Sequence, residues 1–331
     1  MTLAVAGDVM LARDVAPYYP YVAEALRTLR ETLGVSAFVA NLESPVCHAS
    51  LLEGRKFRAD PSDCGDVLKL FDVLSVANNH SLDCGIEGFI ETVYVLRSLG
   101  VTPVGYRPQG RLQEPARLQC DGYKVSIIGL LDQELLPEAV GTCIATCDDL
   151  DTVQREVINA REAADFVICL LHAGDEMVSF PLEREKELPR FLSANGVDIV
   201  VRSGSHTLQG YETEGLRLIL YSLGDFIFDG PARRRRTAGL ATLKFTSTGV
   251  QFRPYRVQHD KHRSPHLTMR QPFRYPNLPV WCQDLRRSLD YAVYYFERAE
   301  HVFATEGISN GIREVASRLW HREYLPRKYG R

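Results

Sequence analysis

Five residues of types that bind metal ions each follow a short apolar run of this chain. They are Asp8, Glu43, Asn79, His172 and His206. Each run is typical of a buried strand, and ligands bind at the carboxyl ends of strands in an open α/β sheet. Any one of these residues alone is more often a turn, a cap or a rim side chain. Together at one sheet edge they predict a metal-dependent catalytic site.

The donor types narrow the chemistry of this predicted site. Carboxylate, amide and imidazole donors favour Zn, Mn or Fe over Ca or Cu, and we expect one or two divalent ions. Glu43 is suited to bridge two cations. A bound metal would lower the pKa of a water at neutral pH. His80 is adjacent to Asn79 and is expected to face the substrate as a general acid or base.

Alternating strand and helix patterns position these residues. The predicted strands are 3–6, 37–40, 73–76, 124–130, 166–171, 199–201 and 216–221, and the predicted helices are 21–32, 63–71, 85–99, 150–163 and 182–194. This alternation is typical of βαβ units and a largely parallel arrangement. Consecutive strands at 240–246 and 250–257 then predict a hairpin around 247–249.

The last part of the chain has a different pattern. Residues 258–281 are polar and proline-rich and predict an irregular connection, and 284–303 and 308–320 are typical of amphipathic helices. We therefore predict one α/β domain over 1–258 and a helical appendage over 259–331. The aromatic-rich helix at 284–303 is interpreted as core packing, with a homodimer interface or a lid as the alternatives.

Composition limits the classes of partner. The chain has 331 residues, of which 45% are hydrophobic and 24% charged, and its formal net charge is −3. Such a charge creates no field that attracts nucleic acid or an anionic membrane. The start shows no signal-peptide pattern, and no stretch approaches about 18 apolar residues. Eight cysteines in mostly apolar contexts favour reduced thiols. We expect a cytoplasmic protein without nucleic-acid or membrane partners.

Six motifs, in order and suitably spaced, resemble the CapA family, named for a poly-γ-glutamate capsule synthesis protein with a calcineurin-like metallophosphatase fold. The resemblance covers about residues 3–258, and any one motif alone would be weak. The motifs are Gly7-Asp8-Val9-Met10-Leu11, Ala40-Asn41-Leu42-Glu43-Ser44-Pro45, Phe57-Arg58-Ala59, Ala77-Asn78-Asn79-His80-Ser81-Leu82-Asp83-Cys84-Gly85, Leu171-His172-Ala173-Gly174-Asp175-Glu176 and Tyr221-Ser222-Leu223-Gly224-Asp225-Phe226.

The resemblance implies a metallophosphatase-like β-sandwich flanked by helices, in an α/β/β/α order, with a binuclear metal site on one rim. By this resemblance Asp8 and His206 would bind the first metal, Glu43 would bridge both, and Asn79 and His172 would bind the second. His80 would take the acid/base position, with Glu176 as a further catalytic group. Asp225 and Arg58 would contact the substrate or support the metal ligands.

One position departs from the family pattern. Where the family usually has His-Pro-His, this chain has Gly204-Ser205-His206. Glycine has no side-chain ligand, so the second metal would lose an imidazole, and both one-metal and two-metal sites stay open. Substituting His for Gly204 is predicted to raise metal occupancy.

Other features are interpreted with an alternative beside each. The run Arg233-Arg234-Arg235-Arg236 is either a solvated loop or, through Arg233 and Arg234, a clamp for an anionic substrate. Arg55, Lys56 and Arg58 invite the same two interpretations. Cys84 lies close to His80 and is interpreted as a buried thiol rather than a nucleophile.

These observations predict a metal-dependent hydrolase or transferase acting on a small anionic substrate. The resemblance favours a γ-glutamyl amide or polyglutamate-like substrate over a phosphoester. One alternative is an amide-forming ligase or an accessory to one. The other is a degenerate, non-catalytic scaffold, which the glycine at position 204 supports.

Overall fold

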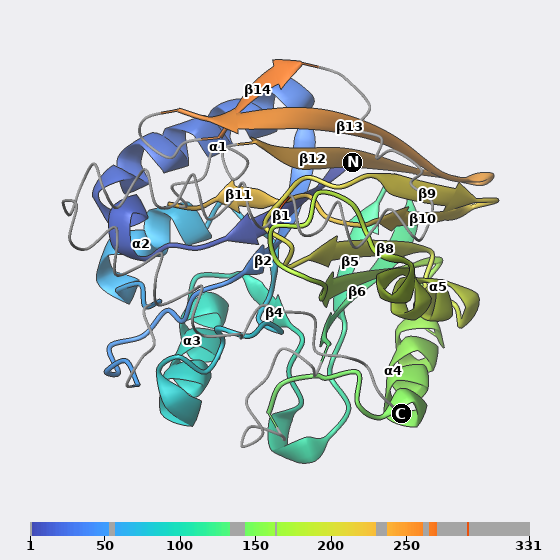
Figure 1. Ribbon diagram of the computed structural model, residues 1–331, viewed down its shortest axis with the longest axis horizontal. Coiled ribbons are helices and arrows are strands. Elements are labelled where there is room, and N and C mark those ends of the chain that lie inside the picture. Colours follow the sequence, from blue (N-terminus) through green and yellow to red (C-terminus); the bar gives the residue numbers. More distant parts are fainter. Residues whose placement is uncertain are drawn as a thin grey trace.

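The computed structural model describes residues 2–52, 57–132, 143–162, 164–229, 237–260, 265–269 and 290, and these residues form two β-sheets (Figure 1). The first sheet has the order β14-β13-β12-β1-β2-β3-β4, and β11 pairs with β1 outside this path. Its strands are β1 (Thr2–Val9), β2 (Val35–Leu42), β3 (Val73–Ser75), β4 (Thr102–Val104), β11 (Asp225–Ile227), β12 (Thr237–Thr246), β13 (Gly249–His259) and β14 (Pro265–Met269).

The second sheet has six strands in the order β5-β6-β7-β8-β10-β9. They are β5 (Ala116–Cys120), β6 (Tyr123–Leu131), β7 (Phe166–His172), β8 (Ile199–Ser203), β9 (Tyr211–Glu214) and β10 (Arg217–Leu220). β6, β7, β8 and β10 are mutually parallel neighbours, as are β1, β2, β3 and β4 in the first sheet. Parallel neighbours align their carboxyl ends, which is how both sheets bring strand ends to one rim.

Each sheet has one face on the other sheet and one face under helices. Between the sheets, Leu3 and Val39 of the first sheet belong to one buried cluster with Ile168 and Val201 of the second. The next residues along the same strands, such as Ala4 and Ala40, face outward, because side chains alternate across a strand. The two-residue alternation of apolar side chains therefore builds both faces of each sheet.

Among the described residues, α-helices cover the outer faces, with α1 to α3 on one side and α4 and α5 on the other (Figure 1). Their apolar stripes, for example Val22 and Leu26 of α1 or Val153 and Val157 of α4, pack on the sheets. The helices are α1 (Tyr19–Leu33), α2 (Pro61–Leu68), α3 (Gly85–Ser98), α4 (Leu150–Glu162) and α5 (Glu187–Ala194). The predicted α/β/β/α sandwich is confirmed.

Several elements differ from the sequence prediction. The short strands β4, β5, β9 and β11 were not predicted, because in three to five residues they show neither a clear alternation nor an apolar run like those that marked β3 and β10. The segment predicted as an irregular connection contains β14, which pairs antiparallel with β13 and extends the first sheet. The predicted helix at 182–194 begins as a 3-10 turn, Glu183–Lys186, before α5.

Most of the predicted C-terminal appendage lies outside the described residues, and so does its predicted dimer interface. Asp290 is described, and its buried carboxylate accepts hydrogen bonds from the Ser179 amide and hydroxyl, at 3.1 and 2.7 Å. In the described part of the chain, we find no helix with the length and apolar composition needed to cross a bilayer.

Candidate metal centre

Strand ends from both sheets deliver the predicted ligands to one place. Asp8 lies near the end of β1, and Glu43 directly follows β2. His172 is the last residue of β7, and His206 lies in the turn after β8. Gly7 allows β11 to approach β1 closely, since a Cβ at Gly7 would lie 1.9 Å from the Gly224 carbonyl oxygen. The sandwich therefore joins the rims of two separate sheets at this point.

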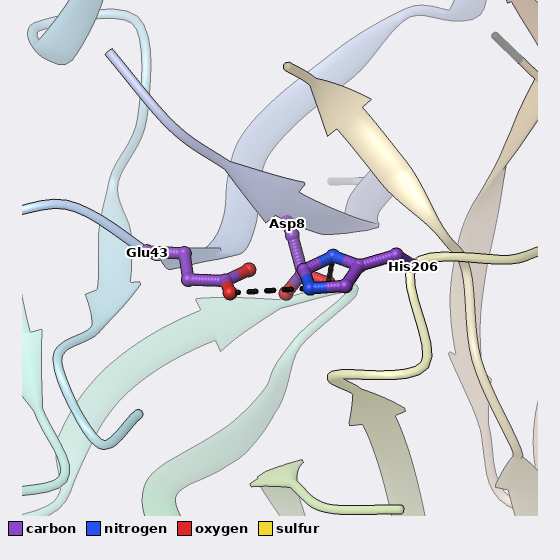
Figure 2. Close-up of side chains that lie close together, drawn as sticks. All are labelled: Asp8, Glu43 and His206. Carbon is purple, nitrogen blue, oxygen red and sulfur yellow. Dashed lines mark ion pairs between the residues drawn. The ribbon is translucent and has the colours of Figure 1, made fainter. Parts of the chain in front are cut away.

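Asp8, Glu43 and His206 form the centre of this arrangement. One potential ligand atom from each lies within 4.8 Å of the others, and Figure 2 shows the three side chains pointing toward one another. His206 Nε2 is 3.5 Å from Glu43 Oε1, and His206 Nδ1 is 3.8 Å from Asp8 Oδ2. Both carboxylates are fully buried.

His172 and Asn79 extend the cluster on the side of Asp8. His172 Nδ1 lies 3.8 Å from Asp8 Oδ1, and His172 Nε2 lies 3.1 Å from Asn79 Oδ1. Two adjacent ligands bonded to one metal at about 2.1 Å are separated by roughly this distance. The structure thus brings all five predicted ligands into one contiguous cluster, while their role in binding metal stays a prediction.

Asp225 holds the imidazole of His206. Its Oδ1 lies 2.7 Å from His206 Nδ1, and the residue is fully buried beside Asp8, with which it is in register across β1 and β11. A carboxylate on one ring nitrogen fixes the orientation of an imidazole and makes the other nitrogen a better ligand. The structure places Asp225 behind the predicted ligand rather than at the solvent-facing side of the site.

Three further polar residues were missed by the sequence reasoning. Asn41 Nδ2 donates to Asp8 Oδ1 at 2.8 Å and lies 3.2 Å from His172 Nδ1. Ser203 Oγ is 3.0 Å from the same ring nitrogen, and Asn78 Nδ2 donates to Asn41 Oδ1 at 3.2 Å. Asn41 and Ser203 lie at the ends of β2 and β8, so their strand-end position was the available signal.

Burial sets the protonation of the cluster. It raises the pKa of Asp8, and the neighbouring Asp225 carboxylate raises it further, while His206 and the Asn41 hydrogen bond lower it. Burial also holds the pKa of His172 well below 6.5, and the nearby His206 and His80 add to this effect. His172 is therefore neutral at pH 7, which is the form that binds a metal.

The donor set fits a divalent cation. Asp8, Glu43 and Asp225 are three fully buried carboxylates around the single imidazole of His206. Ionised together they carry more negative charge than one imidazolium balances, and uncompensated buried charge is costly. A divalent cation held by Asp8, Glu43 and a neutral His206 would offset most of this negative charge, and a second would use Glu43, Asn79 and His172.

Gly204 fits this site because it is a glycine. Its φ is +107°, and a Cβ there would lie 3.1 Å from the Ala173 carbonyl oxygen and 3.2 Å from His172 Nε2. Its amide instead donates to Asp8 Oδ2 at 3.2 Å. The predicted gain of metal on replacing Gly204 with His conflicts with this geometry, because any side chain there is strained and crowds His172.

His80 lies at the edge of the cluster. Its Nδ1 is 3.0 Å from Asp83 Oδ2, and its side chain is 22% exposed. The ring packs on Phe57 at 4.0 Å between centroids, and the backbone amide donates to Asn78 Oδ1. Such contacts orient a group that exchanges protons with a substrate.

The other predicted site residues have different surroundings. Glu176 is half-buried in the loop after β7, where the next residue, Met177, donates its amide to the Ser205 carbonyl. Arg58 donates to the Cys47 carbonyl at 3.0 Å and lies 3.8 Å from Asp60. The predicted substrate residues Arg233 and Arg234 lie outside the described residues, as do Arg55 and Lys56.

Residues 2–230 match the family described as bacterial capsule synthesis protein PGA_cap. The chain belongs to this family. It is 29% identical over 184 residues to the PGA biosynthesis protein CapA of Bacillus subtilis (strain 168), covering 54% of this chain and 48% of that protein. It is 26% identical over 279 residues to the capsule biosynthesis protein CapA of Bacillus anthracis, covering 76% of this chain and 65% of that protein. The chain thus spans less than two thirds of the length of either relative, and the predicted CapA resemblance is confirmed.

Solved structures support the fold. A hypothetical protein from Thermus thermophilus superposes with a TM-score of 0.53 at 17% identity, covering 78% of this chain and all of that one. A novel phosphatase from Mycoplasma pneumoniae superposes with a TM-score of 0.52 at 11% identity, covering 80% of this chain and 95% of that one. The fold is metallophosphatase-like, as the resemblance predicted.

Proposed function

We propose that this chain is a metal-dependent enzyme that hydrolyses or transfers an acyl group of a small anionic substrate. A γ-glutamyl amide or polyglutamate-like substrate is favoured over a phosphoester. The observation that carries the proposal is the convergence of Asp8, Glu43 and His206 within 4.8 Å, with His172 in contact with Asp8. The names of the Bacillus relatives, which refer to PGA and capsule biosynthesis, support the substrate class.

Each side chain has a defined task in this proposal. Asp8, Glu43 and His206 would hold a divalent ion, which when bound supplies Lewis acidity to the scissile carbonyl and to a water. Asp225 keeps His206 Nδ1 engaged at 2.7 Å, so that Nε2 is the atom available to the cation. Asp83 holds His80 Nδ1 at 3.0 Å, which leaves Nε2 to move a proton to or from the substrate.

Metal binding is the first test. The purified protein is loaded with Mn, Zn or Fe(II), freed of excess metal and analysed by elemental analysis beside Glu43→Gln and His206→Ala. We expect at least one equivalent in the wild type and loss of this metal in both variants. Glu24→Gln is the matched control, because Glu24 is an exposed carboxylate on α1. A wild type that binds none of these metals would refute the proposal.

Turnover is the second test. The metal-loaded protein is incubated with γ-linked glutamate oligomers and with p-nitrophenyl phosphate, and products are followed by mass spectrometry and absorbance. Cleavage or transfer of the γ-amide bonds is expected, with loss of activity in His80→Ala while its metal content stays normal. Turnover of the phosphate ester alone would contradict the favoured substrate class.

A second candidate is an accessory role without hydrolysis. The glycine at position 204 removes one imidazole that the second metal would use, and a side chain restored there would be strained by its φ of +107° and would crowd His172. A relative from Mycobacterium tuberculosis (strain ATCC 25618 / H37Rv), 26% identical over 224 residues, is named probable polyglutamine synthesis accessory protein. Partner-dependent ATP turnover in a reconstituted mixture, with no γ-amide cleavage by this chain alone, would favour an amide-forming ligase accessory.

A further inference from the structure

Arg13 lies at the edge of the site and is not among the residues that the sequence predicted to bind substrate. It is the first residue of a short 3-10 turn after β1, and its backbone has a φ of +51°. A non-glycine residue in this left-handed region is uncommon, and such strained residues gather at functional sites. The chain therefore accepts a backbone cost to hold this side chain where it is.

Two contacts fix the plane of the Arg13 guanidinium. Its terminal nitrogen pairs with Asp229, whose side chain is 6% exposed. Its Cζ lies 4.3 Å from the centre of the Phe57 ring, over that ring. The Arg13 side chain itself stays 35% exposed, so part of the guanidinium faces solvent.

Phe57 connects this guanidinium to the candidate catalytic centre. The Phe57 ring also packs against His80, at 4.0 Å between centroids, so one aromatic ring contacts both the arginine and the predicted proton-transfer group. The ring centroids of Phe57 and Phe228 are 5.8 Å apart, and those of Phe228 and His206 are 5.2 Å apart. A continuous aromatic wall thus runs from the predicted metal ligand to Arg13.

The chemistry of this arrangement suits a carboxylate. A guanidinium has five N–H donors in a rigid plane, and its contact with Asp229 engages one terminal nitrogen. The remaining donors can form a forked pair with a second carboxylate, which a lysine ammonium cannot reproduce. Asp229 and Phe57 hold the plane in place beforehand, which lowers the entropy lost on binding.

We propose that Arg13 determines substrate specificity by binding a free α-carboxylate of a γ-glutamyl substrate whose scissile amide lies at the metal cluster. This inference rests on the proposed function and names the residue that would recognise the anion. A charge-assisted hydrogen bond of this kind contributes roughly ten- to a hundredfold in affinity.

The experiment compares two ligands on the metal-loaded protein by isothermal titration calorimetry. One ligand is a γ-linked glutamate pentamer, and the other is the same pentamer with its α-carboxylates methyl-esterified. The variants are Arg13→Gln and Arg13→Lys. The control is Arg27→Gln, because Arg27 is an exposed arginine on α1 that lies 3.4 Å from Glu24. Metal content and melting temperature are measured for every variant.

The wild type and the Arg27 variant should bind the free acid at least tenfold more tightly than the ester. Arg13→Gln should lose this preference while retaining its metal. Arg13→Lys keeps a positive charge for Asp229 but has no planar fork of donors. Its preference for the free acid over the ester should be at least threefold smaller than that of the wild type. This variant decides the question if Arg13→Gln does not fold.

Two results would overturn the inference in different ways. A preference retained in the Arg13 variants would refute the role of Arg13 and leave the proposed function intact. A wild type with normal metal content that binds neither pentamer would refute the γ-glutamyl substrate class, and the inference with it.

Discussion

Replacing Asp225 with Asn is expected to weaken metal binding without removing any ligand. Asp225 Oδ1 lies 2.7 Å from His206 Nδ1, and neither side chain is more than 5% exposed, so water screens this pair little. Asn keeps the shape of the side chain and loses its charge. Loss of a carboxylate partner of a metal-bound imidazole costs about ten- to a hundredfold in affinity, or roughly 1.4 to 2.7 kcal/mol.

One effect opposes this loss. The Asp225 carboxylate contributes to the raised pKa of Asp8, so the Asn variant should ionise Asp8 at a lower pH. A more readily ionised Asp8 is a better ligand, and this offset shrinks as the pH rises above the pKa of Asp8. The loss of affinity in the Asn variant should therefore be no smaller at pH 7.5 than at pH 6.

Competition with a chromophoric chelator measures the Zn and Mn affinities at both pH values. Asp66→Asn is the matched control, since Asp66 lies on α2 with its side chain 81% exposed, and it should behave as the wild type. The reasoning is refuted if the affinity of the folded Asp225→Asn protein changes by less than about threefold at both pH values.

Three further predictions concern the same region. Gly204→Ala should lower the free energy of unfolding in urea by about 1 to 3 kcal/mol. The loss should exceed that of Gly122→Ala, because Gly122 also has a positive φ, +87°, but has open space around its Cβ position. Equal losses would contradict the close packing at Gly204. Burial lowers the pKa of His172, so below its ordinary pKa of 6.5 the unfolded chain binds a proton that the folded protein does not. The free energy of unfolding should therefore fall as the pH falls below 6.5. When the pH is lowered from 7.5 to 5.5, the melting temperature of the metal-free wild type should therefore fall further than that of His172→Asn. The raised pKa of Asp8 acts in the opposite direction, but Asp8 is present in both proteins. Burial raises the pKa of Cys84 to about 12, so iodoacetamide should leave Cys84 unmodified in the folded protein at pH 7.5, and rapid labelling detected by mass spectrometry would restore it as a candidate nucleophile.

The residue pattern by itself determined most strands and helices and the strand ends that carry the candidate site residues, whereas the two-sheet layering was implied by the family resemblance. Continuous apolar runs at 3–6 and 37–40 indicate strands buried on both faces, and the helical patterns between the strands indicate parallel neighbours. Asp8 and Glu43 could be predicted as neighbours because β1 and β2 are parallel and end at the same rim. His172 ends a strand of the second sheet, so only the packing of the two sheets brings it to Asp8. Short strands such as β11 escaped prediction, since pairing with β1 and not local pattern holds them in the sheet.

Tertiary structure alone decided which polar side chains meet. The pairing of β11 with β1 places Asp225 beside Asp8, and the packing of the second sheet on the first brings His206 to Asp225. Arg13 likewise meets Phe57 across 44 positions of the chain. Gly204 is required by a backbone turn with φ of +107° against the Ala173 carbonyl, which no spacing of residues reveals. Hydrophobic periodicity encodes where a chain is buried, whereas a hydrogen bond depends on distances of a few tenths of an ångström, which only the packed fold sets.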